Sequence, residues 1–442
     1  MSHGTLDDKK EYFELIKSIR DEGDGQSPAI LADLAGPKIR VEVLKKPIKL
    51  EEGQLITLSN ESSGDGFIPI PPSVIFGDVD SDAKVLINDG RVSLHVIKKI
   101  SNNSIQCKTI NPGLVETKKG INFLGVALDV PSLTSQDKLD LELAVNNGAD
   151  WIALSFVRSP DDFYLVKNEI EKFGFNLPIM AKIEKWEAVH YLDKIIKQFD
   201  GVMVARGDLG VELPLERVPI IQKEIITKAR EFGKPVVIAT QILDSMIERP
   251  TPTRAEVSDI ANAIFDGADS LMVTGETAAG NYPKKVIEVL SSVIKETESS
   301  MSRNKKYLKI NQKQIKKKLR KMNTANSISH AACTLAEDLG SKVIVTMTES
   351  GSTANMISKY RPNASIIAMT TVVGICRKLS IVWGVIPALV QRYETADDIP
   401  TLSKKYLNDM NYIQENDKYI ITGGAPINVP GTTNYISVIS ND

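Results

Sequence analysis

Five short apolar segments, each followed by an amphipathic stretch, constrain the fold of this chain most strongly. They are WIALSFV (151–157), IMAKIE (179–184), GVMVARG (201–207), PVVIATQ (235–241) and SLMVTGE (270–276). Near-continuous apolar runs of this length, separated by helical patterns, are typical of parallel strands that are covered on both faces. The sequence therefore predicts an α/β domain, either an open nucleotide-binding sheet or a closed (β/α)₈ barrel.

Two further regions lie outside these five segments. Short alternating runs such as LITLS and VSLHVIKKI, separated by Asn, Gly and Asp, indicate a small all-β module. Strand-like runs alternating with helical patterns return near the C-terminus and predict a second, open α/β domain. We therefore divide the chain into a barrel domain (1–40 and 125–302), an inserted β module (41–124), a basic linker (303–321) and a C-terminal α/β domain (322–442).

Charge and composition exclude several classes of function. The chain of 442 residues has 54 basic and 56 acidic residues. Its net charge is therefore close to zero and does not attract the chain to nucleic acid or to a membrane surface. The basic linker contains one aromatic residue, Tyr307, and so lacks the stacking surface of a nucleic-acid site. No apolar run is long enough to span a membrane, and the three cysteines show no metal-ligand spacing. These features predict a cytoplasmic enzyme.

Polar residues follow the predicted strands at intervals of one β/α unit. No GxGxxG motif opens a helix, which disfavours a dinucleotide-binding sheet, whereas a barrel brings all strand ends to one mouth. Carboxylates in this set are suited to Mg²⁺, and a lysine beside them would stabilise a phosphoryl group in transfer. The residues are Ser155, Lys182 with Glu184, Arg206 with Asp208, Thr240, and Thr274 with Glu276.

Longer motifs resemble one family. ADLAGPKIR (32–40), AKIEKWEAV (181–189), DGVMVARGDLGVELP (200–214), the block 234–269 and TGETAAGNYP (274–283) closely resemble pyruvate kinase, and the resemblance extends to GTTNYISVI (431–439). It implies a TIM (β/α)₈-type barrel with an inserted small β-barrel lid and a C-terminal open α/β domain. It also implies phosphoryl transfer from phosphoenolpyruvate to ADP, giving pyruvate and ATP, in a cytoplasmic homotetramer.

The resemblance also implies roles for individual residues. The catalytic set would be Lys182, Arg40 and Thr240. Substrate would contact Gly207, Asp208, Thr240, Ser155 and Arg206, and the nucleotide would contact His3, Asp89 and Lys119. Glu184 and Asp208 would hold Mg²⁺. A phosphorylated effector would bind the loop containing Thr348, Ser350, Ser352 and Thr353, although an ordinary strand-to-helix cap also fits that loop.

The chain departs from the family pattern at two places. It begins inside the motif Asn-Phe-Ser-His-Gly, so two barrel strands and the helix between them are expected to be missing; a late start codon, a truncation and a reduced relative each explain this. The second departure is Lys38, which stands where potassium-dependent members carry Glu. Together with the monovalent-site positions Ser2, Asp33 and Leu34, it resembles the potassium-independent branch and predicts that K⁺ is not required; a surface lysine without a role is the alternative.

Two other functions stay open at this point. A non-catalytic relative, acting as an effector-binding or oligomer-forming subunit, would keep the fold without the activity. A lyase acting on phosphoenolpyruvate would share the barrel but not the β module inserted after Arg40. The retained set of Lys182, Glu184, Asp208 and Thr240 favours the kinase over both.

Overall fold

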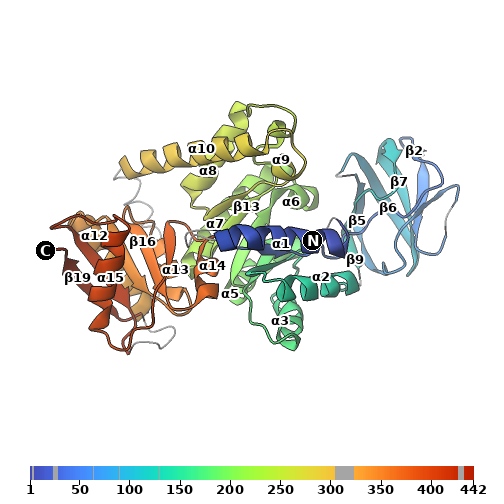
Figure 1. Cartoon of the computed structure of the whole chain (residues 1–442). Coiled ribbons are helices and arrows are strands. Elements are labelled where there is room, and N and C mark those ends of the chain that lie inside the picture. The colour runs from blue at the N-terminus through green and yellow to red at the C-terminus, as the bar shows by residue number, and fades with distance from the viewer. Residues whose placement is uncertain are drawn as a thin grey trace.

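The structure is a computed structural model of the whole chain, and it describes residues 1, 4–22, 28–62, 64–88, 90–128, 130–303, 323–426 and 433–442. Figure 1 shows three bodies in a row, with the barrel domain in the centre, the β module on the right and the C-terminal domain on the left. The predicted linker lies outside the described residues, except for its first residue, Arg303.

A six-stranded parallel sheet forms the centre of the molecule. Its strands run in chain order, with β1 and β14 as the outer strands: β1 (Leu31–Asp33), β10 (Trp151–Leu154), β11 (Ile179–Ile183), β12 (Gly201–Ala205), β13 (Val236–Ala239) and β14 (Ser270–Met272). The five predicted apolar segments therefore contain strands, and the predicted polar residues follow the strand ends, except Lys182, which lies within β11. All residues of β10, β12 and β13 are buried, as parallel strands covered on both faces require.

Helices follow the strands along one face of the sheet. They are α1 (Leu6–Glu22), α2 (Ser135–Asn146), α3 (Asp162–Lys172), α4 (Trp186–His190), α5 (Leu192–Gln198), α6 (Arg206–Glu212), α7 (Val218–Phe232), α8 (Arg254–Asp266), α9 (Gly275–Ala278) and α10 (Pro283–Arg303), with 3₁₀ turns η1 (Leu215–Arg217) and η2 (Asp244–Ile247). Capping boxes begin α2, at Thr134, and α8, at Thr253.

The strand side chains separate into two cores because they alternate in direction. Ile152, Val202 and Ile238 belong to the larger core, which packs against the helices. Trp151, Met203 and Val237 belong to a smaller cluster on the other face, and among the described residues no helix of the barrel domain contributes to this cluster. A sheet with helices on one face and side chains alone on the other has the layering of a barrel rather than of a doubly wound sheet.

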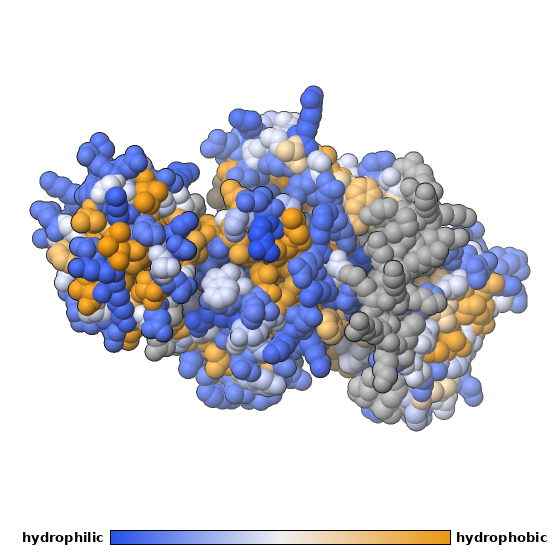
Figure 2. Space-filling model, turned by 180° about the vertical axis from the view of Figure 1, so that it is seen from behind, coloured by the Kyte–Doolittle hydropathy of each residue, from blue (hydrophilic) through white to orange (hydrophobic). Residues whose placement is uncertain are grey.

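The inserted module is a separate β body with its own core, which we call the lid. Its six-stranded sheet has the order β4-β3-β7-β6-β5-β9, and β2 pairs with β8. The strands are β2 (Ile48–Leu50), β3 (Leu55–Ser59), β4 (Phe67–Pro69), β5 (Phe76–Ile87), β6 (Val92–Ser101), β7 (Ser104–Asn111), β8 (Gly113–Val115) and β9 (Ile121–Leu128). Figure 2 shows, from the opposite side, a notch between the lid and the barrel domain.

The C-terminal domain is an open α/β sheet of order β17-β16-β15-β18-β19, in which only β19 is antiparallel to its neighbour. Its elements are α12 (Thr324–Asp338), β15 (Val343–Met347), α13 (Ser352–Ser358), β16 (Ser365–Thr370), α14 (Val373–Leu379), β17 (Val385–Leu389), α15 (Asp398–Asp409), β18 (Lys418–Gly423) and β19 (Tyr435–Ser440). Among the described residues, no helix is both long and apolar enough to cross a bilayer.

The C-terminal domain contacts the barrel domain at the amino ends of the barrel strands. Arg361 donates to Asp269, just before β14, over 3.0 Å, and to the carbonyl of Gly267 over 2.6 Å. Trp151, the first residue of β10, donates its indole N–H to the carbonyl of Lys378. This contact therefore lies at the opposite end of the strands from the predicted site.

Candidate active site

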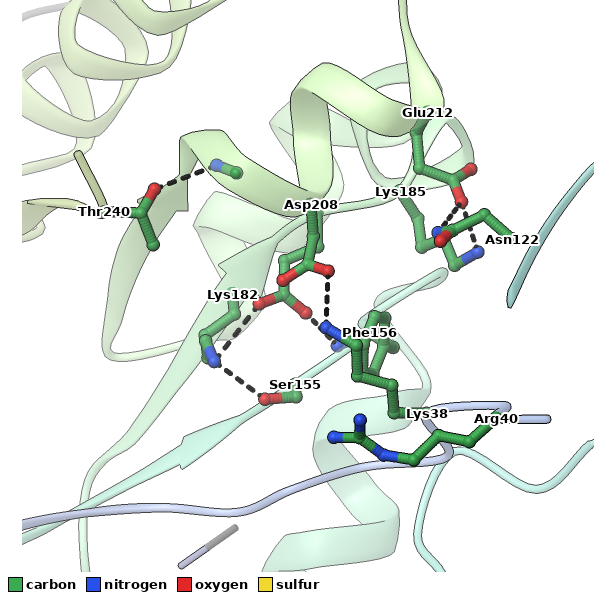
Figure 3. Close-up of polar contacts among 12 residues, drawn as sticks. Lys38, Arg40, Asn122, Ser155, Phe156, Lys182, Lys185, Asp208, Glu212 and Thr240 are labelled. Carbon is green, nitrogen blue, oxygen red and sulfur yellow. Dashed lines mark hydrogen bonds and ion pairs between the residues drawn. The ribbon is translucent and has the colours of Figure 1, made fainter. Parts of the chain in front are cut away.

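The carboxyl ends of the barrel strands bring the predicted polar side chains together (Figure 3). Lys182, in β11, is at the centre of the cluster. Its Nζ lies 3.1 Å from an Oδ of Asp33, 3.1 Å from an Oε of Glu184 and 2.9 Å from Oγ of Ser155. Three neighbouring strands thus supply one ammonium group and its ligands. Of the predicted set, Ser155, Lys182 and Glu184 therefore contact one another directly at these strand ends.

Burial and charge act against each other at Lys182. Burial lowers the pKa of the lysine, but the carboxylates of Glu184 and Asp33 outweigh burial and hold the pKa above its ordinary value. Lys182 is therefore a permanent cation at neutral pH. Because its amino group is held by three ligands, its charge has a fixed position.

Glu184 and Asp208 are suited to a divalent cation. The Glu184 side chain is 1% exposed, and burial raises the pKa of its carboxyl; Lys182 opposes this shift and Asp208 adds to it. A cation between the two carboxylates would offset the cost of burying them together. The N–H of Phe156 donates to the second Glu184 oxygen over 2.8 Å, which fixes the carboxylate. The residues present therefore fit Mg²⁺. Among the described residues, no group of three or more His, Cys, Asp and Glu forms a metal site.

Lys38 contacts the same cluster from the segment that leads into the lid. Its Nζ lies 3.0 Å from an Oδ of Asp208, and both side chains are partly exposed. The second Asp208 oxygen has no protein partner among the described residues. Lys38 is therefore a second ammonium group at the carboxylates, and it is not an isolated surface lysine. Leu34, by contrast, is fully buried in the core and offers only its carbonyl, which accepts from Ser155.

Thr240 lies in a left-handed turn after β13. Its φ is +67°, and that of Gln241 is +54°, a conformation that non-glycine residues rarely adopt. The hydroxyl of Thr240 donates to the carbonyl of Ala239 over 2.6 Å and accepts from the N–H of Gly207 over 2.8 Å. The turn is held by Arg206, whose guanidinium donates to the carbonyls of Thr240 and Gln241 and pairs with Asp259. Arg206 therefore positions the turn.

The remaining predicted residues fall into two groups. Arg40 is exposed, donates to the carbonyl of Lys118 and bridges to Gly120, so it joins the entry to the lid with the segment just before lid strand β9. Lys119, next to it, lies 3.7 Å from Glu116. Ser2, His3 and Asp89 lie outside the described residues.

Thr274 and Glu276, also expected at the mouth, have structural contacts. Glu276 is buried and accepts from the N–H groups of Leu243 and Thr274. It ties the loop after β14 to the loop after β13. This pair therefore supports the mouth from outside the Lys182 cluster.

The predicted effector loop connects β15 to α13. Thr348 accepts from the N–H of Gly351, Ser350 contacts Ser352, and Thr353 contacts Thr433 over 2.8 Å. Glu349 accepts from the hydroxyl of Thr371. All four predicted hydroxyls are therefore engaged within the domain, and the acidic side chain of the loop is directed to Thr371.

Sequence reasoning missed a second polar cluster beside the first. Asn122, in lid strand β9, donates to Glu212 at the end of α6 over 3.0 Å, and Lys185 donates to the same oxygen over 2.6 Å. Glu212 is buried, and its other oxygen has no partner among the described residues. We call this set the lid latch, since it joins the lid to the barrel domain (Figure 3). The motifs AKIEKWE and GVELP contain two of its members but do not reveal the contact.

The fold is a parallel β/α barrel-type sheet with an inserted lid. At the ends of its strands, a fixed ammonium group lies between carboxylates. These features define the class of barrel enzymes that act on anionic, metal-bound substrates. The profile described as "Pyruvate kinase, barrel domain" matches residues 1–287, and "Pyruvate kinase, alpha/beta domain" matches residues 326–439. The chain therefore belongs to the pyruvate kinase family, and it is a phosphotransferase of glycolysis.

Individual relatives agree over nearly the full length. The chain is 40% identical to the pyruvate kinase of Thermotoga maritima, over all of this chain and 92% of the relative. It is 38% identical to that of Clostridium acetobutylicum, over 99% of this chain and 92% of the relative. The crystal structure of a pyruvate kinase from Cryptosporidium parvum matches with a TM-score of 0.90 at 31% identity, over all of this chain and 90% of that structure.

Proposed function

We propose that the chain transfers the phosphoryl group of phosphoenolpyruvate to ADP at the Lys182 cluster, with pyruvate and ATP as products. One observation carries this assignment of the site: the Lys182 ammonium is held at the strand ends by Asp33, Glu184 and Ser155. A phosphoryl group in transfer spreads negative charge over its oxygens. A fixed cation beside it stabilises that charge without first having to reorganise.

Glu184 and Asp208 would hold Mg²⁺, which would neutralise phosphate and carboxylate oxygens of the substrates. Lys38 keeps one Asp208 oxygen and leaves the other for the metal. The Phe156 N–H holds Glu184 from behind, so the carboxylate presents one oxygen to the mouth. The protein would thus supply two hard ligands and leave the other positions for water and substrate.

The carboxylate of phosphoenolpyruvate would bind the N–H groups of Gly207 and Asp208 at the start of α6. In the structure, Thr240 accepts from Gly207, so the substrate carboxylate would share or replace that contact. The Thr240 proton is committed to the Ala239 carbonyl. We therefore assign Thr240 to positioning the substrate and a water molecule, and that water would protonate the enolate.

The nucleotide would bind between the cluster and the lid. Arg40 lies where the chain enters the lid and Lys119 lies in the lid itself, just before β9, so closure of the lid would bring their charges toward the phosphates. His3 and Asp89 complete this set by their positions in the family motifs. Arg40 would contact the phosphoryl group itself.

Lys38 supports a reaction that does not require K⁺. Its ammonium contacts a carboxylate of the metal pair, so the site contains a protein cation where potassium-dependent members carry a glutamate and bind K⁺. The positions of Ser2, Asp33 and Leu34 would then not need to hold a monovalent ion. Asp33 already pairs with Lys182.

We extend the proposal to the rest of the molecule on the family resemblance. The chain would form a homotetramer in the cytoplasm, in accord with free cysteines at 107, 333 and 376. A phosphorylated effector would bind at Thr348, Ser350, Ser352 and Thr353, where it would have to displace the present hydroxyl contacts. A non-catalytic role is less well supported because the Lys182 cluster is intact.

Titration of activity with Mg²⁺ tests the site. We expect Glu184→Gln and Asp208→Asn to raise the Mg²⁺ concentration for half-maximal pyruvate formation by about tenfold or more, because each removes one charged ligand. Asp161→Asn, at an exposed carboxylate before α3, is the matched control and should leave the curve unchanged. Unchanged Mg²⁺ curves in both site variants would refute the assignment.

A further inference from the structure

A cavity of about 340 Å³ lies where the lid meets the barrel domain. Both connecting segments line it: Ile39 belongs to the first, and Val126 and Leu128 belong to the second. Lys182, Glu184 and Asp208 are not among its lining residues. The cavity is therefore a space at the hinge beside the catalytic cluster, and it adjoins that cluster through Phe156, whose N–H holds Glu184.

The wall of this hinge cavity combines apolar and aromatic side chains with charged ones. Phe123 from the lid and Phe156 and Trp186 from the barrel domain contribute rings. Trp186 is 49% exposed, an unusual exposure for a tryptophan, and it lies in the short helix α4. A volume of this size with an apolar wall suits a small organic ligand. The Phe156 ring already lies near one cation, since Nζ of Lys185 is 6.0 Å from its centroid.

The basic side chains of the cavity already have protein partners, whereas its acidic side chains have no ion pair with a described residue. Arg158 donates to the carbonyl of Val130 over 2.7 Å and to Ser132 over 2.9 Å. Lys185 is paired with Glu212 in the lid latch. The two basic side chains are therefore occupied by protein acceptors.

The acidic side chains are not paired in this way. Asp78 and Asp80 are exposed residues of lid strand β5, and neither has an ion pair with any described residue. Glu187, on the barrel side, has one buried oxygen without a hydrogen-bond partner among the described residues. Carboxylates thus stand on both sides of an apolar space whose cations are already engaged.

We propose that the hinge cavity binds an organic ammonium ion with an aromatic or aliphatic body. The body would fill the apolar space against Phe123, Phe156 and Trp186, and the ammonium group would face Asp78 and Asp80. Because the ligand would contact the lid and the barrel domain at once, it would stabilise the lid position seen here. This site does not depend on the roles assigned to the catalytic cluster.

Three probes with one skeleton test the proposal on the full chain: 4-phenylbutylamine, 4-phenylbutan-1-ol and 4-phenylbutyrate, which differ only in the charge of the end group. Binding is followed by calorimetry and by the fluorescence of Trp186, with Trp186→Phe to assign the signal. We expect the amine to bind about tenfold more tightly than the alcohol, and the carboxylate to bind most weakly. Added salt should reduce the preference for the amine.

Variants of one strand provide the control. The double change Asp78→Asn and Asp80→Asn should reduce the preference for the amine to less than about threefold, because it removes the lid carboxylates but keeps the cavity. Asp82→Asn, on the same strand but not in the cavity wall, should bind like the wild type. Equal affinity for amine and alcohol, absence of binding by the wild type at millimolar concentration, or a preference retained in the double variant would overturn the proposal. Since the readout is binding, failure of the catalytic assignment would not affect it.

Discussion

At the scale of single residues, the site depends on where a few charges are fixed. Lys182 and Lys38 place two ammonium groups among Asp33, Glu184 and Asp208. Lys182 is held by partners from its own and neighbouring strands, whereas Lys38 is partly exposed and has one acidic partner. We therefore expect changes at Lys38 to alter the ion requirement without disturbing the fold.

Lys38→Glu should create a dependence on potassium. The change replaces a cation near Asp208 with a carboxylate, so activity should fall by about tenfold or more in tetramethylammonium and recover in part with K⁺. Turnover is measured at constant ionic strength, and Lys45→Glu, at an exposed lysine, serves as the charge-reversal control. High, potassium-independent activity of Lys38→Glu would show that Lys38 has no such role.

At the scale of elements, strand ends and connecting turns determine which side chains meet. Apolar runs and their spacing predict the strands of the barrel domain, the β module and the C-terminal α/β domain, whereas they do not predict the order of the strands within each sheet. The contacts of Thr240 and Arg206 depend on a left-handed turn that no propensity favours. The lid latch joins residues 90 positions apart through the placement of one domain on another. Local patterns cannot predict either feature.

Gly36→Ala tests the turn between β1 and the lid. Gly36 has a φ of +68°, and an added Cβ would lie 2.8 Å from the Phe156 ring. We expect a loss of about 2 kcal/mol of unfolding free energy and a weaker response to Mg²⁺, because Phe156 holds Glu184. Gly374→Ala, in α14 with open space around it, should be neutral or slightly stabilising in urea unfolding. Equal stability of the two variants would contradict this account.

Asn122→Asp tests the lid latch. The change would place a carboxylate against buried Glu212, so the lid should lose its contact with α6. We expect the KM for ADP to rise by about fivefold, while turnover at saturating ADP changes by less than about twofold. Asn111→Asp, at an exposed position of lid strand β7, is the control for added charge. A KM unchanged in both variants would mean that the latch does not hold the lid.

At the scale of the whole molecule, the two ends of the barrel strands have different roles: the candidate active site lies at one end, and the contact with the C-terminal domain lies at the other. The lid and the Lys182 cluster lie at the carboxyl ends of the strands, and the C-terminal domain packs at the amino ends (Figure 1). Arg361 and Asp269 form the buried ion pair of that contact, with side chains 3% and 6% exposed. If the predicted effector loop binds a ligand, its signal would have to cross this interface to reach the cluster.

Arg361→Met should weaken the contact between the C-terminal domain and the barrel domain. Removing one partner leaves Asp269 buried without its cation, which costs about 3 kcal/mol or more. Differential scanning calorimetry should show a lower transition temperature and a separate transition for the C-terminal domain. Lys342→Met, which breaks the exposed Lys342–Asp417 pair, should cost less than about 1 kcal/mol. Equal losses in the two variants would contradict the assigned importance of the buried pair.

The most direct measurement compares ATP formation from phosphoenolpyruvate and ADP by the wild type, Lys182→Met and Lys182→Arg, each with its unfolding temperature. We predict that the wild type forms pyruvate and ATP together and requires Mg²⁺. Both variants should lose about 10²-fold or more in turnover, since Met removes the fixed cation and Arg displaces it. Lys182→Arg should retain more of the unfolding temperature, because it keeps a positive charge beside Glu184. A wild type that forms no ATP, or a folded Lys182→Met with half of the wild-type turnover, would contradict the account.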